Sequence, residues 1–388
     1  MTTQKTKLMG LPCPSHNWRK SGKRVVALFA AVATAWLTVY LVWYTPLTVY
    51  ILDHLNLRPL FLPNILCPLC NNFTFNFVVD NRNFCTSTSG SDVFLLILVA
   101  TFHANLDARQ AIRASWGNVS TYRGQTIKTL FLFGLHDDKN YNYQVRYELE
   151  NYGDVVQADF KDDYKWLTNK TMMGLTWAHR FCPSAKYVLK TDDDGFNVPQ
   201  RFVDYLMNVR APRFVGGYCF TVMPDRRDGS KFYVPYSMYP EQYYPTYCSG
   251  PGYVLSRLAV AEVLSVANNV IFLPMEDVFV SGICRVAAGI IYTQIVGVAE
   301  DQRQMTRCKL ATWVKNGHNI YPAAVPPIWA RVMDATRDKD CVGQRTGVFL
   351  GLTVFLVVWV KHIYTLTQLE KNDILEGLLI SGKSNAKL

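Results

Sequence analysis

Three consecutive carboxylates, Asp192, Asp193 and Asp194, directly follow the apolar segment KYVLK of residues 186–190. Adjacent carboxylates repel one another and lose hydration when enclosed, so this arrangement is unfavourable unless cations neutralise it. Their oxygen atoms suit Mg²⁺ or Mn²⁺, and such an ion can bridge to a diphosphate. A solvated acidic turn is the alternative, but the position after a buried strand favours a metal site.

A second pair of carboxylates, Glu276 and Asp277, lies among apolar residues in the segment MEDVF. A partly buried carboxylate can act as a general base that removes a proton from a hydroxyl group. The alternative is a helix-capping pair, because Pro274 precedes the segment and acidic residues favour helix N-termini.

Residues 244–253, with the sequence YPTYCSGPGY, lie between the two acidic segments. Their glycines and prolines predict a tight loop. Their aromatic rings offer flat faces against which a sugar ring could lie. We therefore expect Tyr247, Gly250 and Gly252 to form a sugar pocket; the alternative is an ordinary aromatic-rich turn.

The elements that must position these residues alternate between strands and helices. Continuous apolar runs predict buried strands at 93–101, 129–135, 155–160 and 186–190, and helical patterns predict helices at 108–116 and 167–181. This alternation predicts a mostly parallel sheet in a three-layer α/β body. Ligands of such folds bind at the carboxyl ends of the strands, where the three aspartates are expected.

The formal net charge of +10 has an uneven distribution along the chain. The first 24 residues carry six basic side chains and no acidic one, and residues 25–44 are uncharged. About 20 apolar residues span a bilayer, and a basic flank stays in the cytoplasm. The run exceeds the roughly 7–15 apolar residues of a cleaved signal peptide. This distribution of charge therefore indicates a signal anchor that leaves the rest of the chain in the lumen. Because the anchor explains the basic residues, the net positive charge is no evidence for nucleic-acid binding, and that function is excluded.

The remainder of the chain divides into segments of different composition. The apolar run 346–360 is short for a membrane span, so a span extended to residue 366 and an interfacial or packed helix both remain open. The expected organisation is a cytosolic tail (1–24), an anchor (25–44), a stem (45–90), a lumenal catalytic domain (91–342) and a C-terminal tail (343–388) with a possible second membrane segment at 346–366.

Two further features agree with a lumenal address. Asn72, Asn118 and Asn169 each begin an Asn-x-Ser/Thr glycosylation triplet. Nine of the ten cysteines follow the anchor, where disulfides can form, and the odd number leaves one thiol free or intermolecular. At Cys67 and Cys70, a disulfide of the stem or no special role is favoured over a zinc site, because no second cysteine pair accompanies them.

Taken together and in order, the motifs resemble those of the β1,3-galactosyltransferase family, glycosyltransferase family 31. These inverting enzymes include β1,3-N-acetylglucosaminyltransferases. The similarity covers nearly all of the body and rests on RQAIRASWG (109–117), FLFG (131–134), DFKDDY (159–164), LTNK (167–170), CPSAKYVLKTDDD (182–194), YPTYCSGPGY (244–253), EDV (276–278), Cys308, His318, Pro322 and Trp329.

The resemblance implies a GT-A glycosyltransferase fold, a Rossmann-like α/β architecture, with a UDP-sugar donor and Mn²⁺. It assigns Asp194 as the main metal-binding carboxylate, with Asp192 nearer the donor ribose and His318 completing the metal shell. The residues that it places at the donor site are Arg113, Trp116, Asp192 and Asp193. Three positions depart from the family pattern without removing a carboxylate, namely Ser115, Trp166 and Ser281 before Gly282.

The resemblance further assigns Asp277 as the catalytic base and Glu276 as the residue that orients it. The expected protein is a single-pass type II Golgi enzyme that transfers a hexose, galactose first, from a UDP donor to the 3-hydroxyl of an acceptor glycan on protein or lipid. Transfer of N-acetylglucosamine or N-acetylgalactosamine is the alternative within enzymes, and a non-catalytic lumenal glycan-binding protein is the remote one. The sequence does not specify the acceptor or the oligomeric state.

Overall fold

The computed structural model describes residues 65–86, 92–302 and 305–335. The expected anchor at 25–44, much of the stem and the apolar segment at 346–366 lie outside the described residues. Within the described residues, no helix is both long and apolar enough to cross a membrane. Membrane anchoring therefore stays a prediction from the sequence.

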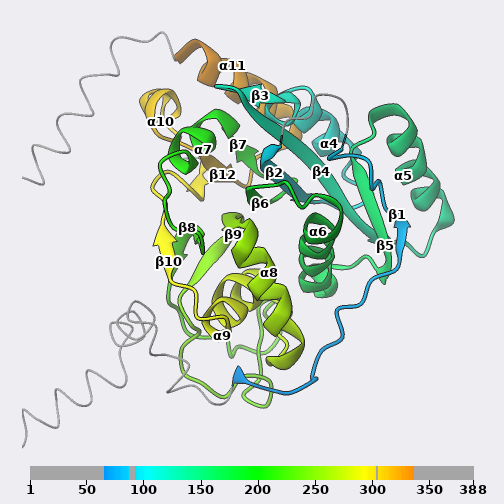
Figure 1. Cartoon of the computed structure of the whole chain (residues 1–388), viewed down its shortest axis with the longest axis vertical. Helices are drawn as coiled ribbons and strands as arrows, with labels where there is room; N and C mark the ends of the chain where they lie inside the picture. Colours follow the sequence, from blue (N-terminus) through cyan, green and yellow to red (C-terminus); the bar gives the residue numbers. More distant parts are fainter. Residues whose placement is uncertain (1–64, 87–91, 303–304, 336–388) are drawn as a thin grey trace, which may run out of the picture.

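A nine-stranded mixed sheet forms the centre of the protein, with the strand order β1-β5-β4-β2-β6-β9-β8-β10 and β3 paired with β4 (Figure 1). The strands from β5 to β6 run parallel to one another, and β9 is antiparallel to both of its neighbours. The strands are β1 (Phe77–Val79), β2 (Val93–Ala100), β3 (Thr121–Tyr122), β4 (Gln125–Leu135), β5 (Val155–Lys161), β6 (Tyr187–Asp192), β8 (Val215–Phe220), β9 (Tyr247–Ser256) and β10 (Tyr292–Gln294).

Helices cover both faces of this sheet, so the expected three-layer α/β body is confirmed. The expected mostly parallel sheet is wrong, because four of the eight strand pairs of this sheet among the described residues are antiparallel. Helices α6 and α8 lie side by side on one face, whereas α4, α5, α7 and α11 pack on the other (Figure 1). The helices are α4 (Leu106–Arg113), α5 (Lys139–Tyr152), α6 (Leu167–Phe181), α7 (Pro199–Leu206), α8 (Arg257–Val266), α9 (Arg285–Ala287), α10 (Arg307–Thr312) and α11 (Val325–Ala335).

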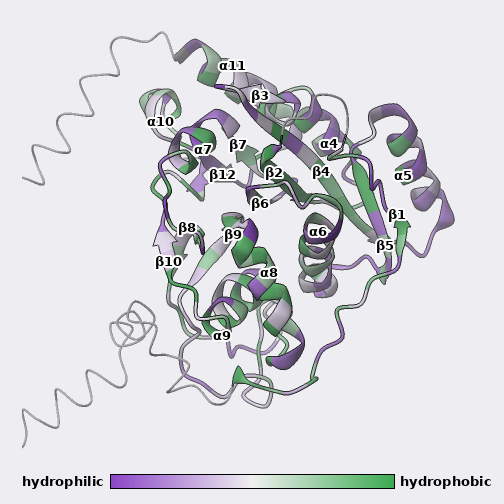
Figure 2. Ribbon diagram, viewed as in Figure 1, coloured by the Kyte–Doolittle hydropathy of each residue, from purple (hydrophilic) through white to green (hydrophobic). Residues whose placement is uncertain are grey.

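The side chains of β2 explain why both faces need a cover. Leu96 and Leu98 join the core under α6 and α8, and Leu95, Ile97 and Val99 join the core under α4 and α7. Because successive side chains of a strand point to opposite faces, an all-apolar strand requires two apolar layers. Figure 2 shows hydrophobic residues along the central strands and hydrophilic ones on the outer face of α5.

The loop expected at 244–253 is wrong from Tyr247 onward, because these residues begin strand β9 between β6 and β8. The glycines of this segment permit close packing within the sheet. A Cβ atom on Gly252 would come within 2.7 Å of Cγ of Asn316, and the same atom on Gly250 would lie 3.1 Å from Oε1 of Glu276. Glycine in a strand often marks such a close approach, and a local reading of turn residues misses it.

A small second sheet lies beside the end of β6. It consists of β11 (Glu300–Asp301), β12 (Asn316–His318) and β7 (Phe196–Asn197), in that order. The amide nitrogen of Ile320 donates to the carbonyl oxygen of Asp194 at 3.0 Å. This sheet therefore holds the residues after β12 against the acidic turn.

Three disulfides join described cysteines. Cys85 pairs with Cys182, Cys219 with Cys248, and Cys67 with Cys70. The last pair agrees with the disulfide expected in the stem and leaves these thiols unavailable to zinc. Cys284 is buried and free, in agreement with the odd number of cysteines beyond residue 44.

Candidate functional site

The three aspartates after β6 have different surroundings. The carboxylate of Asp193 accepts hydrogen bonds from Oγ1 of Thr101 at 2.6 Å and Nδ2 of Asn105 at 2.9 Å. These contacts attach the acidic turn to the segment after β2. The donor-binding role expected for Asp193 stays a prediction, since its carboxylate is already held by the protein.

Asp194, in contrast, is exposed, and its carboxylate accepts no hydrogen bond from the described residues. Enclosure of its carboxyl group by the surrounding protein raises the pKa of Asp194 to about 6, and the charges of Asp192 and Asp193 add to this effect. Asp194 lines a recess of about 380 Å³ together with Asn319 and Tyr321. Among the described residues, no basic side chain forms an ion pair with Asp194.

Lys190 links the two acidic segments from inside the sheet. Its Nζ atom donates to Oδ1 of Asp192 at 2.8 Å, to the carbonyl oxygen of Gly250 at 3.0 Å, and to the carboxylate of Glu276. Although burial opposes it, the charges of Asp192 and Glu276 raise the pKa of Lys190, so the amine stays protonated. Lys190 is not among the residues expected at the site, although a lysine within an otherwise apolar strand is a usable signal.

Glu276 and Asp277 lie just before the π-helical segment η5 (Val278–Cys284). Burial raises the pKa of Glu276 to about 7, and its Oε2 atom accepts from the hydroxyl of Tyr253 at 2.8 Å. Oδ2 of Asp277 accepts from the amide of Gly250 at 3.1 Å, and Oδ1 accepts from the amide of Val278 at 2.9 Å. Burial also raises the pKa of Asp277, which makes it a stronger base than a solvated aspartate.

The residues expected in the sugar pocket separate into two groups. Gly250 packs against both carboxylates of the Glu276–Asp277 pair, with an added Cβ lying 3.4 Å from Oδ2 of Asp277. The ring of Tyr247 lies 4.8 Å from that of Phe220, centroid to centroid, and only 8% of Tyr247 is exposed. Gly250 therefore shapes the carboxylate site, and a sugar contact by Tyr247 stays a prediction.

We call Lys190, Asp192, Asp194, Glu276 and Asp277 the carboxylate cluster. Four acidic side chains and one basic side chain meet at the carboxyl edge of the sheet, so negative charge is in surplus. Surplus charge in a partly enclosed site attracts cations and raises carboxylate pKa values.

The residues around Asp194 suit a hard divalent cation in chemistry but do not form a complete ligand set. His318 ends β12, and the amide of Ile320, two residues later, donates to the carbonyl oxygen of Asp194 at 3.0 Å, so the segment that carries the imidazole lies beside Asp194. Among the described residues, no three His, Cys, Asp or Glu side chains form a group that could hold a metal ion. An ion held by Asp194 and His318 would need its remaining ligands from a bound anion and water, as Mg²⁺ and Mn²⁺ commonly take them.

Arg113 and Trp116, expected at the donor site, lie in a different environment. An Nη atom of Arg113 is 2.8 Å from a carboxylate oxygen of Glu148 and 2.8 Å from one of Asp154. Glu148 also pairs with Arg109, and Trp116 is fully buried in the core. We call Arg109, Arg113, Glu148 and Asp154 the ion-pair network. Neither Arg113 nor Trp116 lines the recess at Asp194, so their donor role stays a prediction.

The three expected glycosylation sites differ in accessibility. Asn72 and Asn118 are exposed, whereas Asn169 is partly buried within helix α6 and Thr171 of its triplet is buried. Modification of Asn169 in the folded protein would require opening of this helix. The structure therefore favours Asn72 and Asn118 as acceptors, and occupancy stays a prediction.

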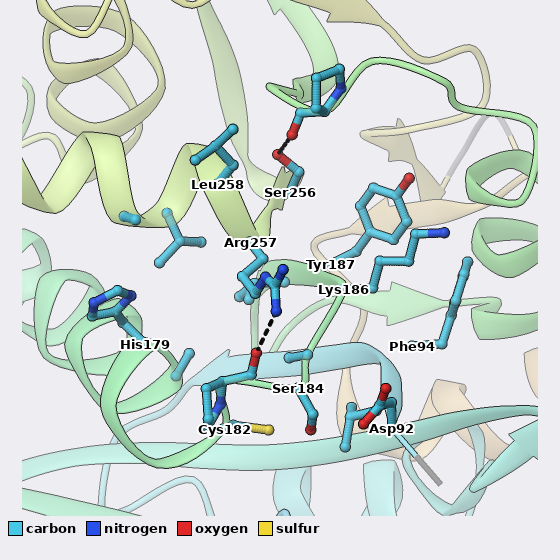
Figure 3. A pocket seen from close by; sticks show the side chains of 18 of the residues that line it. Asp92, Phe94, His179, Cys182, Ser184, Lys186, Tyr187, Ser256, Arg257 and Leu258 are labelled. Atoms are coloured by element: carbon cyan, nitrogen blue, oxygen red, sulfur yellow. Dashed lines mark hydrogen bonds between the residues drawn. The ribbon is translucent and has the colours of Figure 1, made fainter.

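A larger cavity, of about 890 Å³, lies at the opposite edge of the sheet (Figure 3). Its walls include Phe94 at the amino end of β2 and Lys186 before β6, and Nη1 of Arg257 donates to the carbonyl oxygen of Pro183 at 3.2 Å. No member of the carboxylate cluster lines it. The cavity is therefore separate from the candidate site.

Comparison with known proteins agrees with the geometry. Residues 107–296 match the family model described as Galactosyltransferase. Human and mouse β1,3-galactosyltransferase 1 are each 36% identical to this chain over 269 residues, which is 69% of this chain and 81% of the relative. β1,3-Galactosyltransferase 5 of Pan paniscus is 42% identical over 193 residues, 49% of this chain and 64% of the relative. The solved bifunctional glycosyltransferase WbbM has a TM-score of 0.35 at 10% identity, covering 65% of this chain and 52% of that one, which is too distant to assign the fold.

Proposed function

The chain belongs to the β1,3-galactosyltransferase family of glycosyltransferases, and we propose that it transfers galactose from UDP-galactose to the 3-hydroxyl of an acceptor glycan. The proposed reaction inverts the anomeric carbon and forms a β1,3 linkage. One observation carries the proposal: Asp277 is held by the backbone amides of Gly250 and Val278 beside a surplus of carboxylates. This position suits a base that acts on a bound hydroxyl group.

Asp277 is the proposed catalytic base. It takes the proton of the acceptor 3-hydroxyl while that oxygen forms a bond to the anomeric carbon of the donor. The bond between the anomeric carbon and the phosphate oxygen breaks, and its electron pair leaves with UDP. Glu276, which directly precedes the base, is the proposed positioning residue. Lys190 and Tyr253 hold the carboxylate of Glu276 in place.

The recess beside Asp194 is the proposed donor site, in a catalytic domain of the GT-A type. Asn105 and Asp107 line it from the start of α4, and Tyr321 lines it from the turn after β12. Asp194 and His318 would hold Mn²⁺, and a bound metal neutralises the charge that develops on the leaving diphosphate. The family membership and the mixed α/β sheet support this assignment.

We also propose a type II arrangement in the Golgi membrane. The uncharged segment 25–44 anchors the chain, and the catalytic body lies in the lumen with an acceptor glycan carried by protein or lipid. The basic residues before the anchor, the glycosylation triplets and the three disulfides support this location.

UDP release by the detergent-solubilised full chain tests the proposal. UDP-galactose, UDP-N-acetylglucosamine and UDP-N-acetylgalactosamine are compared, with Mn²⁺ or EDTA, over acceptor sugars that present a free 3-hydroxyl group. The expected result is metal-dependent release from UDP-galactose that increases with one acceptor. Release from another donor alone would change the proposed donor, and binding of UDP or glycans without release from any donor would contradict the enzymatic proposal.

A further inference from the structure

Two exposed aromatic residues, Tyr164 and Trp166, lie on a short turn beside the segment that carries Glu276 and Asp277. Residues Tyr164–Trp166 form a 3₁₀ turn that leads directly into helix α6. Oγ1 of Thr168 donates to the carbonyl oxygen of Leu273 at 2.8 Å. Because Leu273 lies three residues before Glu276, this hydrogen bond fixes the turn beside the segment that carries the proposed base.

Tyr164 connects the turn to the site electrostatically. Partial burial raises the pKa of Tyr164, and the negative charges of Asp277 and Asp192 add to this effect. The ring itself remains accessible, since 56% of Tyr164 is exposed. The side chain therefore presents a free face to solvent next to the carboxylates.

The loop between β8 and β9 approaches the same turn. Nζ of Lys231 lies 5.8 Å from the ring centroid of Tyr164 and 4.7 Å from that of Phe232. Trp166 and Phe232 are 44% and 46% exposed. This turn and loop thus offer exposed aromatic faces near the Glu276–Asp277 segment, where the rings of Tyr244 and Tyr247 are buried, and Tyr321 is the exposed ring of the recess at Asp194.

We propose that Tyr164 and Trp166 form the binding platform for a saccharide acceptor of at least two sugar rings. The apolar face of the reacting hexose lies against Tyr164, and the ring next to it in the acceptor lies against Trp166. A hexose ring has a face of C–H groups, which the negative face of an aromatic ring attracts, while its hydroxyl groups keep contact with water. The inference rests on the proposed transfer reaction, because it places the reacting ring beside Asp277.

Saccharide binding to the full chain in the presence of UDP tests the platform without any need for transfer. The probes are methyl β-galactoside and N-acetyllactosamine, which share a terminal galactose ring, with dissociation constants from NMR titration and acceptor KM values from UDP release. Trp166→Ala is expected to weaken disaccharide binding about tenfold, equivalent to about 1.4 kcal/mol, and to leave monosaccharide binding within about twofold. Tyr164→Ala is expected to weaken both ligands, and Trp166→Phe to retain most of the affinity.

The controls separate this platform from the proposed reaction. Tyr143→Ala removes another exposed aromatic ring, which lies on α5 and is 62% exposed, and is expected to change the affinity for neither ligand. The KM for UDP-galactose is expected to stay unchanged in all four variants. Equal disaccharide affinity in the wild type and Trp166→Ala, or no saccharide binding by the wild type, would overturn the platform. Absence of UDP release with normal saccharide binding would contradict only the proposed reaction.

Discussion

The carboxylate cluster and the ion-pair network are both groups of charged side chains on sheet edges and helices, but their charges balance differently. The network pairs two arginines, Arg109 and Arg113, with two carboxylates, Glu148 and Asp154. The carboxylate cluster contains four acidic side chains but one basic side chain, that of Lys190. In the first region every charge has an opposite partner, and in the second most carboxylates share one cation or have none.

The pKa values follow this difference. Although burial opposes it, the hydrogen bonds and charges of Arg109 and Arg113 lower the pKa of Glu148. In the cluster, burial raises the pKa of Glu276 to about 7. The carboxyl group of Asp194 loses part of its hydration although the residue is open to solvent on one side, and this loss together with the charges of Asp192 and Asp193 raises its pKa to about 6. Paired charges can be buried at little net cost, whereas uncompensated ones destabilise a fold and are typical of sites where a ligand completes them. Charge balance therefore distinguishes the candidate site from a structural group of the same residue types.

The largest loss of stability should come from removing Lys190, the cation of the carboxylate cluster. Lys190→Met leaves the buried carboxylate of Glu276 without its positive partner. We expect a loss of about 3–5 kcal/mol in the free energy of unfolding, measured by urea titration at pH 7, because the remaining charge is uncompensated. The double variant Lys190→Met/Glu276→Gln should recover part of this loss. No difference between the single and double variants would show that the charges are not coupled.

The buried side chain of His103 shows how burial disfavours the charged form of a basic group. His103 is 1% exposed, and its Nδ1 atom lies 3.5 Å from Oδ2 of Asp162. Burial lowers the pKa of His103 from 6.5 to about 4, against the attraction of Asp162. Protonation therefore favours the unfolded chain, and this contribution to stability is present above pH 6.5 and lost as the pH falls toward 4.

The variant His103→Phe should remove this pH dependence. The lower pKa corresponds to about 3 kcal/mol at about 1.4 kcal/mol per pH unit. Urea unfolding at several pH values between 7 and 4 should show a correspondingly flatter decline for the variant than for the wild type. Parallel declines in the two proteins would contradict the assignment of a buried neutral histidine.

Opening the ion-pair network should affect stability and spare catalysis. Glu148→Gln removes the charge that Arg109 and Arg113 share, and we expect a loss of about 2 kcal/mol, since hydrogen bonds to charged groups contribute about 1.5–3 kcal/mol. The UDP dissociation constant of the folded protein should not change. Glu150→Gln, at an exposed position of the same helix, is the matched control. A selective loss of UDP binding in Glu148→Gln would instead place the network at the donor site.

The smallest expected effect comes from Gly250→Ala, which tests how this glycine positions the carboxylates of the cluster. An alanine at Gly250 would bring its Cβ within 3.1 Å of Oε1 of Glu276 and 3.4 Å of Oδ2 of Asp277. Displacing the base by tenths of an ångström should lower the rate of transfer about tenfold, while UDP binding stays the same. Ser249→Ala, on the opposite face of the same strand, serves as control. Equal rates in Gly250→Ala and the control would show that the glycine does not position the carboxylates.

The strands and helices around the site could be predicted from the sequence because each is set by local pattern. The apolar runs at 93–101 and 155–160 are strands β2 and β5, and the expected helix at 167–181 has the observed bounds of α6. Strand β9 could not be recognised, since its Gly and Pro residues are turn formers in isolation. Its extended conformation depends on pairing with β6 and β8, which are distant in the sequence.

The candidate site was only partly accessible to sequence reasoning. Carboxylates at strand ends were visible as Asp192–Asp194 and Glu276–Asp277, and the structure joins them through Lys190. Lys190 and Glu276 are 86 residues apart in the sequence, so no local sequence pattern predicts their contact. Asp193 and Asp194 look equivalent in the sequence, but only the structure shows that Thr101 and Asn105 already hold one of them.

The most direct test of the account compares Asp277→Asn with the wild-type full chain. Asparagine keeps the size of the side chain and removes its basicity. We expect the rate of transfer from UDP-galactose to fall by roughly 10²–10⁴-fold, the usual contribution of a general base, while the dissociation constant of UDP remains within about threefold. Transfer by Asp277→Asn at the wild-type rate would contradict Asp277 as the base and with it the proposed role of the carboxylate cluster.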